Sequence, residues 1–270
     1  MTVINNHDPE TMKKNKDYII FFVPRSGSTL LTELLVQTGQ MGNPQEWLNK
    51  NCFDMYKEKY NYNSDNIDEY LKTLKNEQRT ANDIFGMEMA HHQFKMLESI
   101  EKLWDYFDFA TKCIFLRREN CLEQAISLYK SRMTNVWHVR SDRVDIPQVE
   151  YNRQELMKSL KVIINEEVNL INFFRHYKIV PLMITYEELR SAHQGVLKKI
   201  ASFLETDISV TLNVSDINLK KIGKEDEVKS LSEQFIADAG KRIQLEVSRL
   251  KEAYQAWGLD SRVKIVDQFD

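Results

Sequence analysis

The sequence predicts an α/β fold in which helices flank a parallel β-sheet. Four short apolar segments have the continuous hydrophobicity of buried parallel strands, and each is followed by apolar residues at helical spacing. Alternating strands and helices favour parallel pairing through right-handed crossovers. The 270 residues suit one large domain, and no internal repeat or Gly/Ser-rich linker divides them. We therefore expect a single domain.

Each predicted element comes from a local pattern of apolar residues. The strands are expected at Tyr18–Val23, Ile84–Met89, Lys112–Leu116 and Ile179–Thr185. The helices that follow these strands are expected at residues 30–35, 94–103, 119–133 and 189–204. Three further helices, which we interpret as insertions, are expected at residues 65–78, 154–176 and 228–257. Ser64 or Asp65 is the expected N-cap of the first inserted helix.

Composition and charge exclude several classes of protein. Lys and Arg together number 37 and Asp and Glu 40, so a net charge of −3 argues against a nucleic-acid-coating protein. Cys52, Cys113 and Cys121 are too few and too scattered for a disulfide scaffold or a zinc ribbon, and they indicate a reducing compartment. No apolar segment approaches the roughly 20 residues of a transmembrane helix. We expect a cytoplasmic protein with a polar tail at residues 1–17 and a domain at 18–270.

The segment PRSGSTLL, Pro24–Leu31, lies between the first strand and the first helix. A helix N-terminus has unpaired N–H groups and the positive end of the helix dipole, which together attract anions. Gly27 lets the backbone curl around such an anion. Hydroxyl donors and one fixed charge come from Ser26, Ser28, Thr29 and Arg25. An ordinary serine-rich helix start would use the same residues. The first glycine and the lysine of the nucleotide triphosphate loop are missing, which argues against a magnesium-dependent kinase.

A second candidate phosphate site follows the third strand. Arg117 and Arg118 end that strand, and Ser127 lies about two turns into the next helix. An arginine and a serine so placed can hold a phosphate, although a solvated arginine pair and a surface serine are the plain alternative. Either arginine can face inward. Ligands bind at the carboxyl edge of parallel sheets, so both sites together fit 3′-phosphoadenosine 5′-phosphosulfate (PAPS), which has two separated phosphates.

In this order, PRSGSTLL and the later LRRE and AISLY segments resemble the PAPS-dependent sulfotransferases, most closely the bacterial trehalose 2-sulfotransferase-like branch. Further matching segments are TGQMGNPQEW (38–47), GMEMAHHQF (86–94), VWH (136–138) and ITYEEL (184–189). The resemblance covers roughly residues 18–204, and the region after Asp207 matches poorly. It implies a P-loop-like sulfotransferase fold and, as is usual among these enzymes, a homodimer. Glu88 stands where the family pattern leads us to expect a basic residue, which indicates a different acceptor.

The resemblance also implies the reaction. A PAPS-dependent sulfotransferase moves a sulfuryl group from PAPS to an acceptor hydroxyl, here of a carbohydrate or another small molecule, and releases 3′-phosphoadenosine 5′-phosphate (PAP) without a metal ion. By the resemblance Glu46 is the general base, and Arg25 supplies positive charge at the reacting phosphate. On the residues alone, a glutamate favoured by the helix dipole explains Glu46 equally well. The alternative bases are His91, His92 and His138.

The sequence says less about the acceptor and the C-terminal region. The expected acceptor-pocket residues are His92, Gln93, Trp137 and His138. Lys220, Lys221 and Lys224 lie where cytosolic sulfotransferases close a basic loop over the 3′-phosphate, but their spacing also suits a solvated loop. Two rival functions are a nucleotide-dependent phosphotransferase and a non-catalytic phosphoadenosine-binding protein. The missing lysine after Gly27 argues against the first, and Glu46 argues against the second.

Overall fold

The computed structural model describes residues 16–59, 66–97, 99, 101–108, 111–138, 147–208 and 224–259. Four residues for which the sequence carried an expectation, Ser64, Asp65, Lys220 and Lys221, lie outside the described residues, as do residues 1–15 of the expected tail.

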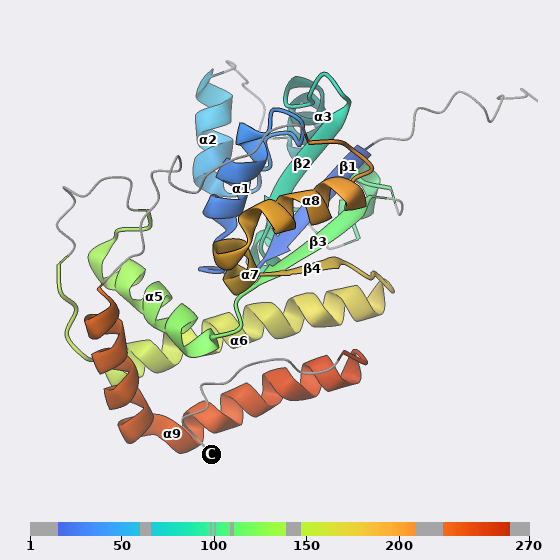
Figure 1. The fold of residues 1–270 in the computed structure, drawn as a ribbon. Helices are drawn as coiled ribbons and strands as arrows, with labels where there is room; N and C mark the ends of the chain where they lie inside the picture. The colour runs from blue at the N-terminus through green and yellow to red at the C-terminus, as the bar shows by residue number, and fades with distance from the viewer. Residues whose placement is uncertain are drawn as a thin grey trace, which may run out of the picture.

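Four parallel strands form one sheet in the order β2-β1-β3-β4 (Figure 1), which confirms the predicted α/β fold. The strands are β1 (Lys16–Phe22), β2 (Ile84–Met89), β3 (Lys112–Arg117) and β4 (Leu182–Thr185). β4 is shorter than predicted because it begins only after Pro181, which has no N–H group to donate to a neighbouring strand.

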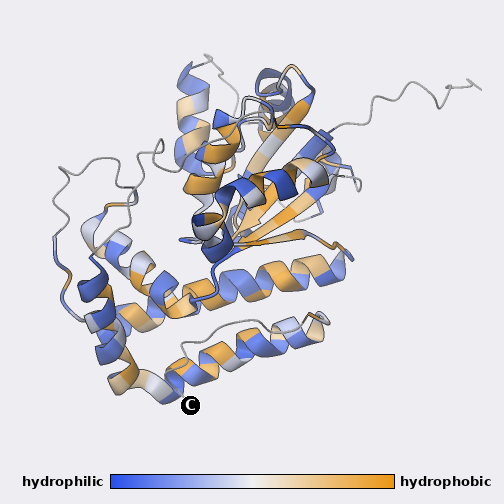
Figure 2. Ribbon diagram, in the orientation of Figure 1, coloured by the Kyte–Doolittle hydropathy of each residue, from blue (hydrophilic) through white to orange (hydrophobic). Residues whose placement is uncertain are grey.

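Successive side chains of β1 point to opposite faces of the sheet, so each face has its own apolar core. One face carries Tyr18, Ile20 and Phe22, which pack in a cluster with residues of three helices. These helices are α1 (Ser28–Gln37), α7 (Tyr186–Ser191) and α8 (His193–Phe203). Figure 2 shows the hydrophobic strands between helices whose outer surfaces are mostly hydrophilic.

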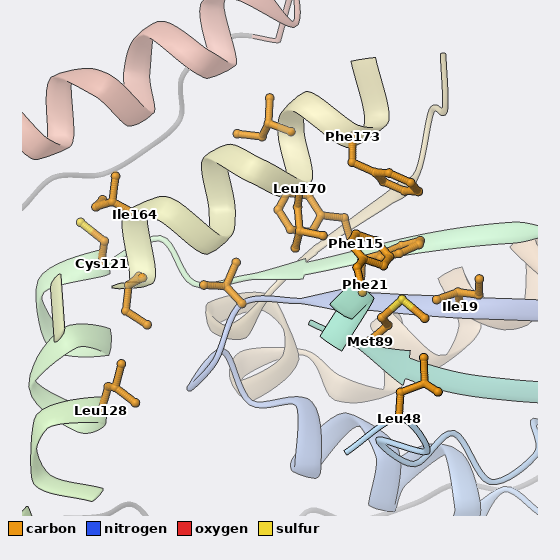
Figure 3. Packing of buried hydrophobic residues seen from close by; sticks show 14 of the residues in the cluster. Ile19, Phe21, Leu48, Met89, Phe115, Cys121, Leu128, Ile164, Leu170 and Phe173 are labelled. Carbon is orange, nitrogen blue, oxygen red and sulfur yellow. The ribbon is translucent and has the colours of Figure 1, made fainter. Parts of the chain in front are cut away.

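The opposite face of the sheet packs against α6 (Arg153–His176). The ring centroid of Phe21 on β1 lies 5.2 Å from that of Phe173 (Figure 3). It lies 5.3 Å from the ring centroid of Phe174. Beyond α6 lies α9 (Glu225–Ala256), and α5 (Cys121–Thr134) packs against both. Although α6 and α9 are long, the described ranges contain no helix that is both long and apolar enough to cross a membrane.

The remaining elements are α2 (Lys50–Lys59), α3 (Ile67–Glu77), the 3-10 helix η2 (His91–Leu97) and α4 (Leu103–Tyr106). Three features of the helices differ from the sequence prediction. The pattern at 94–103 thus forms two short elements instead of one helix. The N-cap of α3 is Asn66, which accepts from two backbone N–H groups, and the predicted caps were wrong. The helix expected at 189–204 is divided at Ala192, whose φ of −143° leaves the helical region.

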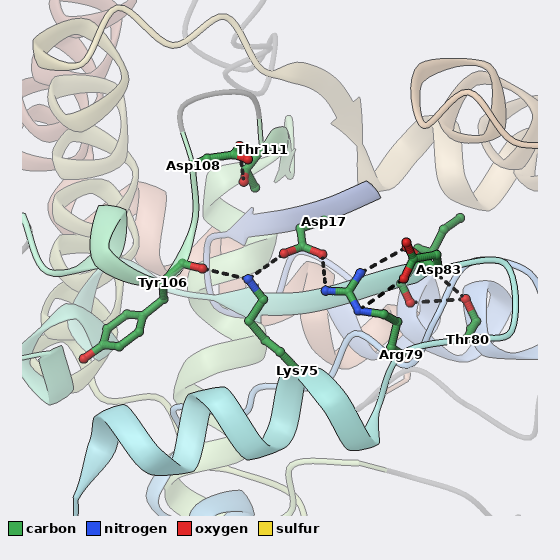
Figure 4. Close-up of polar contacts among 9 residues, drawn as sticks. Asp17, Lys75, Arg79, Thr80, Asp83, Tyr106, Asp108 and Thr111 are labelled. Carbon is green, nitrogen blue, oxygen red and sulfur yellow. Dashed lines mark hydrogen bonds and ion pairs between the residues drawn. The ribbon is translucent and has the colours of Figure 1, made fainter. Parts of the chain in front are cut away.

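A buried ion cluster closes the amino edge of the sheet (Figure 4). Asp17 on β1 is 3% exposed, and its carboxylate oxygens lie 2.6 Å from Nζ of Lys75 and 2.7 Å from a guanidinium nitrogen of Arg79. Lys75 also donates to the carbonyl of Tyr106 at 2.7 Å. The cluster therefore fastens α3 to the start of the sheet and neutralises the buried carboxylate.

Candidate functional site

The carboxyl edge of the sheet carries the loop between β1 and α1. Gly27 is the N-cap of α1 with φ 88°, a conformation that favours glycine. A Cβ atom at this position would lie 2.7 Å from the ring of Tyr186. No side chain caps the start of α1, so the backbone N–H groups of its first turn are not used by a cap and can bind an anion. The loop therefore has the geometry expected for an anion site.

Arg25 carries the fixed charge of this loop. Its Nε donates to Oγ of Ser127 on α5 at 3.1 Å, and another guanidinium nitrogen donates to the carbonyl of Trp137 at 2.8 Å. Both partners are neutral. Burial, together with repulsion from Arg118, lowers the pKa of Arg25 to about 10. The loop thus holds a positive charge that none of the described carboxylates neutralises.

The two arginines at the end of β3, Arg117 in the strand and Arg118 directly after it, face different parts of the molecule. The guanidinium carbon of Arg118 lies 4.6 Å from the ring centroid of Tyr186, the ring that faces Gly27. Arg118 also pairs with Glu123 of α5 and lies 3.9 Å from Glu187. Arg117 is 5% exposed, and its Nε lies 3.2 Å from Oε1 of Glu167 on α6. The structure therefore brings Arg118 and Ser127 beside the loop, and it directs Arg117 toward α6 and α9.

The loop hydroxyls have three different surroundings. Ser26 is fully buried, and its Oγ has no hydrogen-bond partner among the described residues. Ser28 is 8% exposed and hydrogen-bonds Glu88. Oγ1 of Thr29 lies 3.4 Å from Nδ1 of His138, in the segment after α5. The structure thus brings His138 and the carbonyl of Trp137 to the loop, as it does Ser127.

Glu46 lies in the segment between α1 and α2. Its Oε2 accepts from Nε2 of Gln93 at 2.9 Å and from Nδ2 of Asn49 at 3.1 Å. Gln93 is 2% exposed, and its Oε1 accepts from the N–H of Ala90 at 2.9 Å. Both bonds to Glu46 reach the same oxygen, and its Oε1 accepts no hydrogen bond from another described side chain. The carboxylate is therefore held at one oxygen and available at the other.

Glu88 on β2 is the site residue that sequence reasoning did not assign a role, although its acidic character was noted. It is 3% exposed, contacts the hydroxyl of Thr32 on α1, and donates its N–H to the carbonyl of Gln45 at 2.9 Å. Burial raises its pKa well above the usual value, and the charge of Glu46 raises it further, against hydrogen bonds that lower it. Glu88 therefore connects α1 to the segment that carries Glu46.

Two of the candidate histidines, His91 and His92, lie on η2 and face α6. Nδ1 of His92, on a half-exposed side chain, lies 3.2 Å from Oε2 of Glu166 on α6. Nδ1 of His91 lies 3.5 Å from Nδ2 of Asn169, and burial lowers the pKa of His91. Over the part of the chain that the structure describes, no three His, Cys, Asp or Glu residues gather in a way that could hold a metal ion.

One protein family and two solved structures resemble this chain. The Stf0 sulphotransferase family matches residues 17–230. The crystal structure of a sulfotransferase from Alicyclobacillus acidocaldarius aligns with a TM-score of 0.51 at 12% identity, covering 88% of this chain and 98% of that one. A structure of retinol dehydratase in a complex with retinol and PAP aligns with a TM-score of 0.42 at 13% identity, covering 88% and 82%. No curated protein matches.

The family match includes the loop, both arginines, Glu46 and the strands that position them. Because it extends over most of the chain, the chain belongs to the Stf0 sulphotransferase family, and the expectation of a PAPS-dependent sulfotransferase is confirmed.

Proposed function

We propose that the enzyme moves the sulfuryl group of PAPS to a hydroxyl of a carbohydrate or another small-molecule acceptor, with Glu46 as the general base. The observation that carries the proposal is a juxtaposition at one edge of the sheet. The uncompensated charge of Arg25 lies at the start of α1, and Glu88, which contacts Thr32 on the same helix, also lies near Glu46. The proposed site of the anionic donor and the carboxylate that would deprotonate the acceptor therefore lie at the same edge of the sheet.

The residues of the loop and of α5 fit the donor. The described hydrogen-bond partners of Arg25 are neutral, and Arg118 lies close by. A bound phosphate would therefore neutralise positive charge that no described carboxylate balances at Arg25. Arg25 and the loop residues 26–29 are proposed to hold the 5′-phosphosulfate. Arg118 and Ser127 are proposed to hold the 3′-phosphate. The contacts of Arg117 with Glu167 favour a supporting role for that residue.

PAPS supplies a sulfuryl group on a phosphate leaving group. As the leaving group departs, negative charge grows on the 5′-phosphate. Arg25 and the unpaired N–H groups at the start of α1 stabilise that charge because they are already oriented toward the loop. Glu46 takes the proton of the acceptor hydroxyl, which makes the oxygen a better nucleophile.

Glu46 is favoured over the histidines by its partners. Gln93 and Asn49 fix one carboxylate oxygen by donated hydrogen bonds and leave the other to accept a proton. His92 already faces Glu166, and His138 faces Thr29 of the donor loop. Because both ends of the Gln93 amide are used inside the protein, we assign Gln93 to the orientation of Glu46. His92, Trp137 and His138 remain the proposed acceptor-side residues.

Turnover of radiolabelled PAPS with a panel of monosaccharides, disaccharides and other hydroxylated compounds tests this proposal. Glu46→Gln keeps the shape of the side chain and loses the proton acceptor, so turnover should fall by about 10²–10⁴. PAP affinity, measured by calorimetry, should stay unchanged.

The matched control is Glu58→Gln, which alters an exposed glutamate of α2 and should leave turnover at the wild-type rate. His92→Asn and His138→Asn are measured alongside. Near-normal turnover in Glu46→Gln together with a large loss in one histidine variant would transfer the base to that histidine and remove the main support for a carbohydrate acceptor.

The rival functions give different binding results. A phosphotransferase would bind ATP with Mg²⁺ in preference to PAP, and a non-catalytic protein would bind PAP without turning PAPS over. We expect tight PAP binding that EDTA does not change. The homodimer and the cytoplasmic location stay predictions, which light scattering and cell fractionation would test.

A further inference from the structure

Glu88 is a carboxyl group in a place where ionised carboxylates are rarely found. It lies near the carboxyl end of β2, on the face of the sheet that α1 covers, and is 3% exposed. Its described side-chain partners are the hydroxyls of Thr32 and Ser28. No cation among the described residues comes within ion-pair distance. Burying a charge without a cation is costly, whereas burying a neutral carboxylic acid with hydrogen-bond partners is not.

The hydroxyl of Thr32 shows which state of Glu88 fits. Its Oγ1 lies 2.8 Å from the carbonyl of Pro44 and also contacts Oε1 of Glu88. A hydroxyl has one proton to donate, and a carbonyl can only accept. If Glu88 were ionised, one of the two acceptors would face Thr32 without a proton between them. If Glu88 is protonated, it donates to Thr32, Thr32 donates to Pro44, and every group is satisfied.

This chain of hydrogen bonds ends at the segment that carries the proposed base. Pro44 stands two residues before Glu46. The backbone N–H of Glu88 also donates to the carbonyl of Gln45 at 2.9 Å. Both the side chain and the main chain of one residue therefore hold the carbonyls directly before Glu46.

The other titratable groups facing Glu88 are also acids. They come from the segment before α2, from α2 and from β1, and they are Glu46, Cys52 and Tyr18. Burial raises the pKa of Glu88, of Cys52 and of Tyr18, and their mutual repulsion adds to it. A negative charge on Glu88 would also lie directly beside the hydroxyl of Ser28, at the start of the helix that faces the anionic donor.

We propose that Glu88 is a positioning residue whose protonated carboxyl group donates to Thr32, which in turn donates to Pro44, and that this chain fixes the segment bearing Glu46. The role given to Glu46 rests on the proposed function. A neutral Glu88 also keeps a second negative charge away from the donor loop. An acid at a position where the family pattern suggests a base is thereby accommodated without an added charge.

The pH dependence of unfolding tests the protonation. A carboxyl group that is neutral in the folded protein and ionised in the unfolded chain favours unfolding as pH rises above its unfolded pKa. The unfolding constant of the wild type, divided by that of Glu88→Gln, should therefore rise about tenfold per pH unit from about pH 5. Glu246→Gln is the control, since Glu246 pairs with Arg249 and Lys161, and its ratio should stay flat. A flat ratio for Glu88→Gln as well would overturn the proposal.

Hydrogen exchange tests the positioning without any substrate. In Glu88→Leu, which can neither donate nor accept, peptides covering residues 43–49 should exchange at least about tenfold faster than in the wild type. Glu88→Gln has an amide that can donate to Thr32 and should restore most of the protection. Thr32→Val breaks the same chain and should resemble Glu88→Leu. Peptides from α6 provide the internal reference. Unchanged exchange at residues 43–49 in both breaking variants would refute the positioning role.

Kinetics then connect the two proposals. With an acceptor found in the panel, Glu88→Leu should lower kcat at least about tenfold while the KM for PAPS changes little, because a misplaced base slows the chemical step. Glu88→Gln should recover most of that loss. Equal losses for Gln and Leu would mean that the carboxyl group is needed as an acid or a charge, against the proposal. If no acceptor is turned over, the proposed function fails, and the unfolding ratio and the exchange rates still decide the role of Glu88.

Discussion

The two edges of the sheet differ in whether a charged side chain is paired with groups of opposite charge. At the amino edge, the carboxylate of Asp17 is neutralised by two cations at 2.6 and 2.7 Å. At the carboxyl edge, the guanidinium of Arg25 has two neutral partners, and the nearby Arg118 lowers its pKa further. Asp17 is 3% exposed, whereas Arg25, in the loop between β1 and α1, is only partly buried. Only the first is compensated by the chain itself.

This difference separates a structural cluster from a proposed binding site. A compensated ion cluster contributes to folding and offers little to a ligand, because its charges are already used. An uncompensated charge held by the fold is a preorganised place for a ligand of opposite sign. The comparison thus assigns stability to one edge and anion recognition to the other, and each assignment can be broken by mutation.

The largest effect on stability is expected at the amino edge. Asp17→Asn removes the negative charge, which leaves Lys75 without a carboxylate partner and leaves Arg79 with only the longer contact to Asp83 at 3.6 Å. Breaking a buried pair in this way costs about 3–5 kcal/mol, so the urea midpoint should fall strongly. PAP affinity of the folded variant should not change.

The matched control for Asp17 is Asp54→Asn. Asp54 pairs with Lys50 at 2.7 Å, but its side chain is 53% exposed, and such pairs contribute about 0–1 kcal/mol. If Asp17→Asn were no more destabilising than this control, water would have to reach the Asp17 cluster. The amino edge would then lose its structural assignment.

Arg25→Gln is the corresponding change at the carboxyl edge. A charge-assisted contact with phosphate contributes about 1.5–3 kcal/mol, so PAP affinity should fall roughly tenfold to a hundredfold. The free energy of unfolding should change by at most about 1 kcal/mol, because lost hydrogen bonds are offset by relief of the buried charge. Arg153→Gln, which alters an exposed arginine paired with Asp238, is the control for both measurements. A large loss of stability with unchanged PAP affinity would place Arg25 with the structural cluster.

Local patterns predicted most of the sheet and the position of the loop between β1 and α1. The strand at 84–89 has the predicted bounds, and the loop residues stand between a strand and a helix as expected. Both features depend on neighbours in the sequence: continuous apolar residues for the strand, and glycine and hydroxyl residues at the start of the helix. The division of the helix at Ala192 was not predictable, since the apolar spacing continues across it.

Contacts between distant residues were beyond local patterns. Asp17 meets Lys75 and Arg79 only because β1 and α3 are brought together by the fold. The choice between Arg117 and Arg118 was open because β3 is apolar on both faces, so alternation alone does not tell which face is which. In the structure, Phe115 belongs to the core under α6, and Arg117 shares that side of the strand.

The buried Glu88 was equally inaccessible to sequence reasoning. A glutamate inside an otherwise apolar strand is normally expected to reach solvent. Its burial depends on Thr32, Ser28 and Gln45, which approach it from a helix and a segment of the chain more than 40 positions away. The resemblance supplied only the observation that the position is unusual.

The smallest effect concerns how the carboxyl edge would distinguish the two phosphates that are proposed to bind there. Arg118→Ala and Ser127→Ala should weaken PAP more than adenosine 5′-phosphosulfate, which lacks the 3′-phosphate. Arg118 keeps ion pairs with Glu123 and Glu187 that a phosphate must compete with, so the difference between the ligands should lie near the lower end, about tenfold.

Arg190→Ala is a suitable control, since Arg190 also reaches Tyr186 but from the exposed end of α7, and both ligands should bind it as they bind the wild type. Calorimetric titration of each variant with both ligands gives the ratio directly. Equal losses would show that Arg118 and Ser127 support the loop through Tyr186 and Arg25 instead of binding the 3′-phosphate. The uncompensated charge at this edge would then serve the 5′-phosphosulfate alone, and the 3′-phosphate would need partners elsewhere in the chain.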